Sequence, residues 1–380
     1  MTRELDYAAL AAPGLRELSP YVPGKPMETL EREYGISDSI KLASNENPLG
    51  PPSAAVEAAR ACLAELELYP DGEGYALKQR LAEQLGVAPE QITLGNGSNE
   101  LLVMLAETFL EPGREAIYDQ HAFVIYPLAT RATGATSRVA KSQPADHPRQ
   151  PLGHDAASFA DKLGPRSRLM FIANPNNPTG SWITLTELRG LLEQVPRDVI
   201  VVLDEAYAEY ATDPEYPDGL TLLAEFPNLV VTRTFSKIYA LAGLRLGYAV
   251  SQPAMAELLN RIRQPFNTSS VAQAAAVAAL ADHEHVQRSR DLNRAGLAQL
   301  ADGLAALGLR PLPSQGNFLL VEVGSGAMDC YDALLRDGII VRPVANYGLP
   351  DYLRMTVGLP EQNQRLLQAL GQWRESAVAQ

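Results

Sequence analysis

Cysteine, histidine and tryptophan are scarce in this chain. Its 380 residues include only two cysteines, five histidines and two tryptophans, too few for a disulfide framework or a multi-ligand metal site based on thiols and imidazoles. Cys62 and Cys330 lie far apart in the sequence, without the spacing of metal ligands. We therefore expect no metal and two buried thiols in a reducing compartment.

Excess positive charge and long apolar runs are missing as well. The formal net charge is −13, which argues against a nucleic-acid partner. No apolar stretch reaches the roughly 20 residues that a membrane-spanning helix needs, and the first residues, MTRELDYAAL, lack the apolar core of a signal peptide. The sequence thus predicts a cytoplasmic protein that binds neither membranes nor nucleic acids.

The sequence does contain strand-like apolar runs that alternate with helical stretches. Runs such as 199–204 and 229–234 are rich in Val, Ile and Leu, as is typical of central parallel strands covered on both faces. We predict an α/β fold with a mostly parallel central sheet flanked by helices. We expect a large domain over 45–270, a smaller α/β domain over 271–380, and an N-terminal arm over 1–44.

Several of the predicted strands end in polar side chains. These polar groups are Gly97-Ser98-Asn99, Asn177, Asp204 with Tyr207, and Ser236 with Lys237. Each group alone could arise by chance. Ligands of open α/β sheets bind beyond the carboxyl ends of the strands, so the shared placement of these groups predicts one ligand site.

Lys237 is the centre of this predicted site. Burying a charged lysine is costly, and a desolvated lysine has a lowered pKa and can form a Schiff base with an aldehyde. A lone lysine would be read more simply as a surface residue. Here Thr234, Ser236 and Arg245 lie close in sequence and could bind a phosphate, so the segment favours an aldehyde cofactor that carries one.

Two other features of the sequence could bind an anion, and each also has a purely structural interpretation. The segment GNGSNE (95–100) begins a predicted helix, whose free N–H groups attract anions, but Glu100 replaces the third glycine of a dinucleotide fingerprint. An ordinary capped helix is an equal alternative there. Arg342 and Arg354 lie in or beside apolar strands, where a guanidinium needs an anionic ligand or a structural ion-pair partner.

Four motifs together carry a family resemblance that covers essentially the whole chain. NPNNPTG, VVLDEAY, TFSK and AGLRLGY, in this order, resemble the motifs of fold-type-I pyridoxal-phosphate aminotransferases. LSPYVPGKP, KLASNENPLG, LYPDGEGYALK, GNGSNE and YLRMTVG further resemble the histidinol-phosphate aminotransferases among them. The resemblance implies pyridoxal 5'-phosphate as the cofactor.

The resemblance also implies roles for residues around the cofactor ring. Lys237 would hold the cofactor covalently and later move a proton in the reaction. Asp204 would pair with the pyridine nitrogen, and Tyr207 and Asn177 would donate to the phenolate oxygen of the ring. Phe123 would stack on the ring.

Further residues would bind the two phosphates. The resemblance places the cofactor phosphate among residues of three motifs: Gly97, Ser98, Asn99, Thr234, Ser236 and Arg245. Tyr69 would reach the cofactor phosphate of the neighbouring subunit, which implies a homodimer with shared active sites. Tyr21 would close the substrate pocket, with Asn45 near the substrate. Arg354, helped by Arg342, would bind the substrate's phosphate.

The implied reaction is amino transfer between L-histidinol phosphate and 2-oxoglutarate, with glutamate as the product, in histidine biosynthesis. An aromatic amino-acid aminotransferase is the alternative, because the same arginine can hold a carboxylate. A decarboxylase of phosphate-ester amino acids shares most of the cofactor residues. A ligand-sensing regulator is disfavoured, because the roughly 40 residues before the first motif are too few for a DNA-binding domain.

Overall fold

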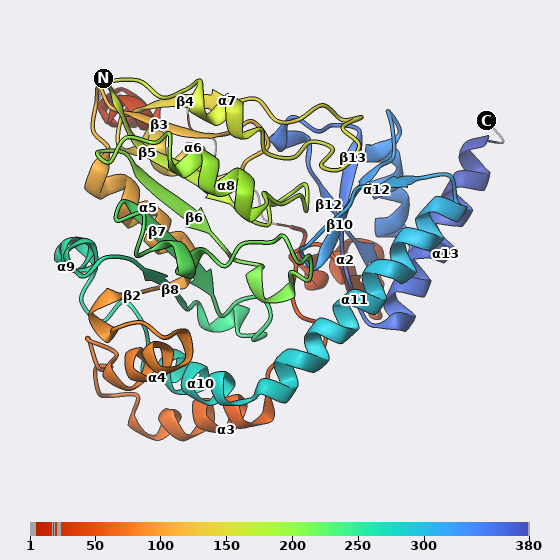
Figure 1. Ribbon diagram of the computed structural model, residues 1–380. Helices are drawn as coiled ribbons and strands as arrows, with labels where there is room; N and C mark the ends of the chain where they lie inside the picture. Colours follow the sequence, from red (N-terminus) through yellow and green to blue (C-terminus); the bar gives the residue numbers. More distant parts are fainter. Residues whose placement is uncertain (1–4, 17, 19, 21–23, 379–380) are drawn as a thin grey trace.

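The computed structural model describes residues 5–16, 18, 20 and 24–378, and it is built around a seven-stranded sheet (Figure 1). The strand order is β2-β8-β7-β6-β5-β3-β4. The strands are β2 (Ile92–Gly95), β3 (Glu115–Asp119), β4 (Thr136–Ala140), β5 (Ser167–Ala173), β6 (Ile200–Asp204), β7 (Leu229–Thr234) and β8 (Gly247–Val250). β8 runs antiparallel to its two neighbours, β2 and β7, and the other pairs are parallel, so the predicted mostly parallel sheet is confirmed.

Helices cover both faces of this sheet, which explains the continuous apolar runs of its central strands. In β6, Val201 and Leu203 enter one apolar core, whereas Val202 enters the other. The first core is closed by α3 (Ser53–Ala61), α4 (Tyr75–Leu85), α7 (Ala156–Ala160), α8 (Leu185–Leu192) and α10 (Ser270–Ala281). The second is closed by α5 (Gly97–Phe109), α6 (Ile125–Ala132) and α9 (Pro253–Ile262).

The C-terminal part of the chain forms a second unit with its own core. Its antiparallel sheet has the order β12 (Arg342–Pro343), β13 (Tyr352–Thr356), β10 (Phe318–Glu322) and β9 (Arg310–Pro311). The flanking helices are α11 (His283–Ala306), α12 (Ala327–Arg336) and α13 (Pro360–Val378). α11 has 24 residues, about 36 Å of helix, and runs from the seven-stranded unit to the C-terminal unit (Figure 1).

The segment IIVRPV is not one strand, as its composition suggests, but two. β11 (Ile339–Ile340) pairs in parallel with β1 (Ile40–Lys41), and β12 follows in the antiparallel sheet. Leu30 of α2 (Met27–Tyr34) packs on this pairing, so the N-terminal segment is attached to the C-terminal unit. A short helix, α1 (Tyr7–Leu10), precedes α2.

The division into an arm and two domains stays a prediction. α10, which begins at the predicted boundary, packs against α3 and α4 of the seven-stranded unit. Both cysteines are free thiols: Cys330 is buried as expected, but Cys62, which follows α3, is only partly buried. Within the described part of the chain, no helix combines the length and apolar character that crossing a membrane requires.

Candidate active site

A cavity of about 250 Å³ lies at the carboxyl ends of β5, β6 and β7, with residues of both units in its wall. Thirteen of the residues predicted from the sequence line it: Asn45, Ser98, Asn99, Phe123, Asn177, Asp204, Tyr207, Thr234, Ser236, Lys237, Arg245, Arg342 and Arg354. These residues come from segments more than 300 positions apart in the chain. The fold therefore brings the strand-end clusters and the two strand arginines into a single site.

Lys237 follows β7 and extends its amine into this cavity. Its Nζ donates to the carbonyl oxygen of Ser44 at 3.0 Å and lies 5.6 Å from the centre of the Tyr207 ring. Burial, and then the positive charges of Arg354 and Arg245, lower the pKa of Lys237 to about 7. A large share of the amine is thus unprotonated near neutral pH, as a nucleophile or base must be.

Asp204, the last residue of β6, presents a buried carboxylate to the same cavity. Its Oδ2 accepts from the Tyr126 hydroxyl at 2.9 Å, and its Oδ1 accepts from the Thr232 hydroxyl at 3.1 Å. Burial raises the pKa of Asp204 to about 6, although both donors oppose that rise. A cationic partner in the cavity would stabilise the carboxylate. Sequence reasoning missed both donors.

Tyr207 and Asn177 supply polar groups on the neighbouring wall. Asn45 donates to the Tyr207 hydroxyl at 2.8 Å, so Tyr207's own hydrogen is free to point elsewhere. Burial raises the pKa of Tyr207 to about 12, and the hydroxyl therefore keeps its proton. Asn177 accepts from Arg354 through Oδ1, which leaves its amide N–H groups as donors.

One end of the cavity is formed by the start of α5 together with Arg245. Gly97 has a φ of 74°, and a Cβ there would lie 2.5 Å from Nη2 of Arg245. At Gly247 a Cβ would lie 2.5 Å from the backbone nitrogen of Ser98. These two glycines let the guanidinium and the helix start approach each other, with Ser236 beside them at 3.4 Å from Nη1 of Arg245. Free N–H groups, a guanidinium and hydroxyls together suit a phosphate.

A second cationic group faces the cavity from the C-terminal unit. Arg342 and Arg354 are directly opposed in the β12–β13 pairing, and both are buried. Arg354 also donates to the carbonyl oxygen of Ala43 at 2.6 Å. Both side chains line the cavity, and the forked donors of a guanidinium match a phosphate or a carboxylate. This end of the cavity therefore suits an anion with more than one negative charge.

Two of the predicted site residues that the structure describes, Gly97 and Tyr69, do not line the cavity. Gly97 is behind the cavity wall, where it makes room for Arg245. Tyr69 is 81% exposed and stacks on Phe266, with 4.7 Å between ring centres, outside the cavity of its own chain. Tyr21 lies outside the described residues.

The residues of the cavity fit pyridoxal phosphate. They provide a phosphate-binding end, the Phe123 ring for stacking, a carboxylate for a ring nitrogen, and an amine for an aldehyde. The buried Asp204 is the strongest of these indications, because a desolvated carboxylate whose two donors are neutral needs a nearby cation to stabilise its charge.

Comparisons with known proteins agree with this geometry. The family model for class I and II aminotransferases matches residues 37–370. The histidinol-phosphate aminotransferase 2 of Pseudomonas aeruginosa is 54% identical over 96% of this chain and 98% of its own, and histidinol-phosphate aminotransferase 1 of Nitrosococcus oceani is 50% identical over 95% and 96%. The crystal structure of histidinol-phosphate aminotransferase from Sinorhizobium meliloti in complex with pyridoxal-5'-phosphate superposes with a TM-score of 0.88, at 30% identity over 97% of this chain and 98% of that one. The chain therefore belongs to the class I and II aminotransferases and, among them, to the histidinol-phosphate aminotransferase family.

Proposed function

We propose that the protein is a pyridoxal-phosphate-dependent transaminase that moves an amino group between L-histidinol phosphate and 2-oxoglutarate in histidine biosynthesis. One observation supports the proposal: a single cavity is lined by Lys237, the buried Asp204 carboxylate, Arg245, and the opposed arginines Arg342 and Arg354. Arg245 and the start of α5 suit the cofactor phosphate. Arg342 and Arg354 suit the substrate phosphate.

Lys237 is the base of the proposed reaction. When bound, pyridoxal phosphate supplies an aldehyde carbon and a ring that accepts an electron pair. Lys237 is the residue that would hold the cofactor through that aldehyde. Because its pKa is about 7, the free Lys237 amine would be a base able to remove the proton from the substrate's amine-bearing carbon.

Asp204 and its neighbours hold protons in place during the reaction. The carboxylate would keep a proton on the ring nitrogen of a bound cofactor, because a nearby negative charge raises that nitrogen's pKa. Tyr126 and Thr232 fix the direction of both carboxylate oxygens. Tyr207, which retains its hydroxyl proton, and Asn177 would donate to the phenolate oxygen of the ring.

The two strand arginines support a phosphate-bearing substrate over an aromatic amino acid. A carboxylate carries one negative charge, whereas a phosphate monoester carries nearly two at neutral pH. Two opposed guanidinium groups match the doubly charged group better. Because Arg354 alone can also hold a carboxylate, the aromatic amino-acid aminotransferase is the competing activity.

Steady-state assays separate the two activities. Purified protein with L-histidinol phosphate and 2-oxoglutarate should produce imidazole-acetol phosphate and glutamate. Phenylalanine and tyrosine, offered with the same acceptor, should react with a much smaller kcat/KM. A larger kcat/KM for phenylalanine than for histidinol phosphate would refute the proposed substrate and leave the transaminase chemistry intact.

We infer that two subunits share their active sites. Large exposed apolar side chains gather on the segment around α3 and α4 and on Phe266, as is typical of an interface: Leu63, Leu66, Leu68, Tyr69, Tyr75 and Phe266. Tyr69, which stacks on Phe266, would reach the partner's cofactor phosphate. Molar mass in solution tests the dimer.

Complementation tests the shared site. Lys237→Ala and Tyr69→Ala each damage a different component of the same site, so a mixed dimer has one intact site. Co-expression should restore activity above that of either variant, to about a quarter of the wild-type level for random pairing. Activity no higher than that of the better single variant would contradict the shared site.

The remaining parts of the proposal concern the arm, the domains and the compartment. Gly24 and Ser44 line the cavity, which supports an arm over 1–44 that closes the substrate pocket, with Tyr21 as the closing residue. We place the large domain at 45–270 and the small domain at 271–380. The two free thiols fit a cytoplasmic, reducing location.

A further inference from the structure

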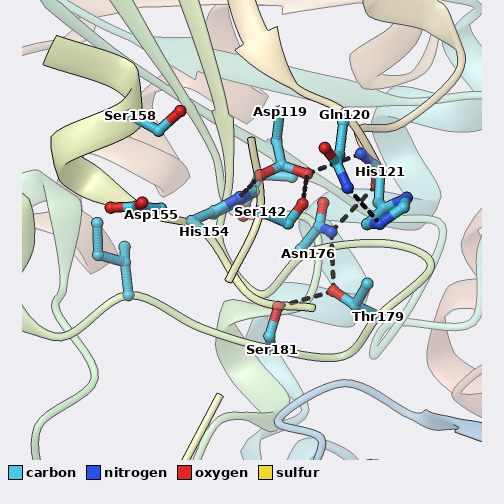
Figure 2. A network of polar contacts seen from close by, with 12 residues as sticks. Asp119, Gln120, His121, Ser142, His154, Asp155, Ser158, Asn176, Thr179 and Ser181 are labelled. Atoms are coloured by element: carbon cyan, nitrogen blue, oxygen red, sulfur yellow. Dashed lines mark hydrogen bonds and ion pairs between the residues drawn. The ribbon is translucent and has the colours of Figure 1, made fainter. Parts of the chain in front are cut away.

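The segment between β3 and α6 positions both aromatic side chains that act at the cofactor end of the cavity. Phe123 lines the cavity, and Tyr126, at the start of α6, donates to Asp204. Residues 120–124 belong to no helix or strand, and side-chain contacts hold their path together with two backbone hydrogen bonds, from Gln120 to the carbonyl oxygen of Ala140 and from Ala122 to that of Asp119. Figure 2 shows those contacts, a buried polar network around Asp119 and His121.

A buried ion pair holds the first part of this turn. Oδ1 of Asp119 accepts from the backbone nitrogen of His121 at 2.7 Å and from the Ser142 hydroxyl at 2.6 Å. Oδ2 lies 3.2 Å from Nδ1 of His154, whose Nε2 lies 2.8 Å from the carbonyl oxygen of Ala173. Nε2 donates to the Ala173 carbonyl oxygen, whereas Nδ1 and Oδ2 lie within ion-pair distance without hydrogen-bond geometry, so a protonated His154 attracts Asp119 by charge. His154 and Asp119 thus anchor the turn to the end of β5 (Figure 2).

His121 connects this anchored turn to two other walls of the cavity. Its Nδ1 lies 2.8 Å from the carbonyl oxygen of Tyr347, in the loop after β12 of the C-terminal unit. Its own carbonyl oxygen accepts from Asn176, the neighbour of Asn177, at 3.2 Å. A carbonyl oxygen can only accept, so Nδ1 carries the hydrogen and Nε2 accepts from Gln120 at 2.9 Å.

We propose that His121 is a positioning residue that couples the substrate end of the cavity to the cofactor end. Its Nδ1–H holds the short 3-10 helix η7 (Ala345–Tyr347), whose Tyr347 lines the cavity, against the turn that carries Phe123. The inference rests on the proposed function, because it assigns the two ends to the substrate and the cofactor. Losing this hydrogen bond should weaken binding at both ends, since neither wall then holds the other in place.

Three variants of His121 isolate the hydrogen bond from the bulk of the ring. His121→Asn places an amide nitrogen near the position of Nδ1 and retains the donor to Tyr347. His121→Gln places its amide near the position of Nε2, and His121→Leu has no donor. For each variant we would measure the dissociation constant of pyridoxal phosphate for the apoprotein, and kcat and KM for histidinol phosphate.

The leucine and glutamine variants should raise both the dissociation constant and KM by roughly three- to tenfold, the effect of one lost buried hydrogen bond, and change kcat less. The asparagine variant should stay within about twofold of wild type. If His121→Leu does not fold, the comparison of His121→Asn with His121→Gln still tests the hydrogen bond.

Two results would overturn the proposal. One is wild-type binding at both ends in the glutamine and leucine variants. The other is an asparagine variant as defective as these two, which would reduce His121 to a packing residue. If the wild-type protein binds pyridoxal phosphate but does not convert histidinol phosphate, the proposed substrate is refuted instead. The cofactor titrations of the His121 variants would then still test whether His121 positions the cofactor end of the cavity.

Discussion

The hydrogen bond from Tyr126 to Asp204 gives a sharp test of how the site controls the cofactor ring. Tyr126→Phe removes the hydroxyl that donates to Oδ2 of Asp204 at 2.9 Å. The ring itself stays, stacked on Phe171 with 4.7 Å between ring centres. Packing is thus preserved, and the carboxylate loses one of its two side-chain donors, with Thr232 remaining.

The magnitude follows from the strength of a hydrogen bond to a charged group. Such a bond contributes about 1.5–3 kcal/mol, which corresponds to about one to two pKa units. The pKa of Asp204 is already raised to about 6 by burial and should rise further in the variant apoprotein. A carboxylate that ionises less readily holds the ring proton less well, so kcat should fall by roughly tenfold or more.

The assay compares kcat for histidinol phosphate in Tyr126→Phe, in Thr232→Val and in the wild type. Thr232→Val is the companion variant, because it removes the other donor to Asp204 with little change in shape. Both variants should be slower than wild type, with the larger loss in Tyr126→Phe, whose bond is shorter. A kcat within about twofold of wild type in both variants would refute the role given to these donors.

Three further changes test other parts of the site. Gly97→Ala puts a Cβ 2.5 Å from Nη2 of Arg245, at a φ of 74°. The affinity of the apoprotein for pyridoxal phosphate should therefore fall roughly tenfold in a titration. An unchanged affinity would contradict the assignment of this end of the cavity to the cofactor phosphate. Arg354→Lys keeps the charge but not the forked donor, so KM for histidinol phosphate should rise roughly tenfold; an unchanged KM would exclude Arg354 from phosphate binding. Burial lowers the pKa of His154, but the close approach and the charge of Asp119 raise it by more, so the net shift is upward. The pair of His154 and Asp119 therefore stabilises the fold fully below about pH 6.5, and this stabilisation is lost as pH rises through the pKa of His154 in the folded protein. Thermal unfolding of His154→Gln should therefore show a deficit at about pH 5.5 that shrinks towards about pH 9, and a deficit independent of pH would refute the ion pair.

Much of the site could be predicted from the sequence, because its parts lie where apolar strands end. The run before Asp204 is buried on both faces, and its polar end has to open into a cavity at the carboxyl edge of the sheet. The same reasoning located Lys237 after β7. The family resemblance then assigned roles that spacing alone could not, such as that of Phe123.

Contacts between distant segments could not be predicted in the same way. Tyr126 lies in the apolar run FVIY, where a tyrosine reads as core, and its partner is 78 positions away. Its ring meets that of Phe123 edge-on with 5.9 Å between ring centres, a contact that helical spacing does not predict because Phe123 precedes α6. The hydrogen bond from His121 to the Tyr347 carbonyl could not be predicted either, because every residue has a backbone carbonyl and the sequence does not show which one accepts.

The split of IIVRPV into two strands has a similar cause. The run has one composition, but Ile339 and Ile340 pair with residues 40–41, almost 300 positions earlier, and Arg342 pairs with Arg354 in another sheet. Strand composition predicts that a segment is extended, and the partner decides which sheet it joins.

The most direct test of the account is to find the atom to which the cofactor is attached. The protein loaded with pyridoxal phosphate is reduced with borohydride, digested and mapped by mass spectrometry. The account predicts loss of visible absorbance and a pyridoxyl group on Lys237 alone, with no label at that peptide in Lys237→Ala. A label centred on another lysine such as Lys41, or a protein that takes up no cofactor, would contradict it.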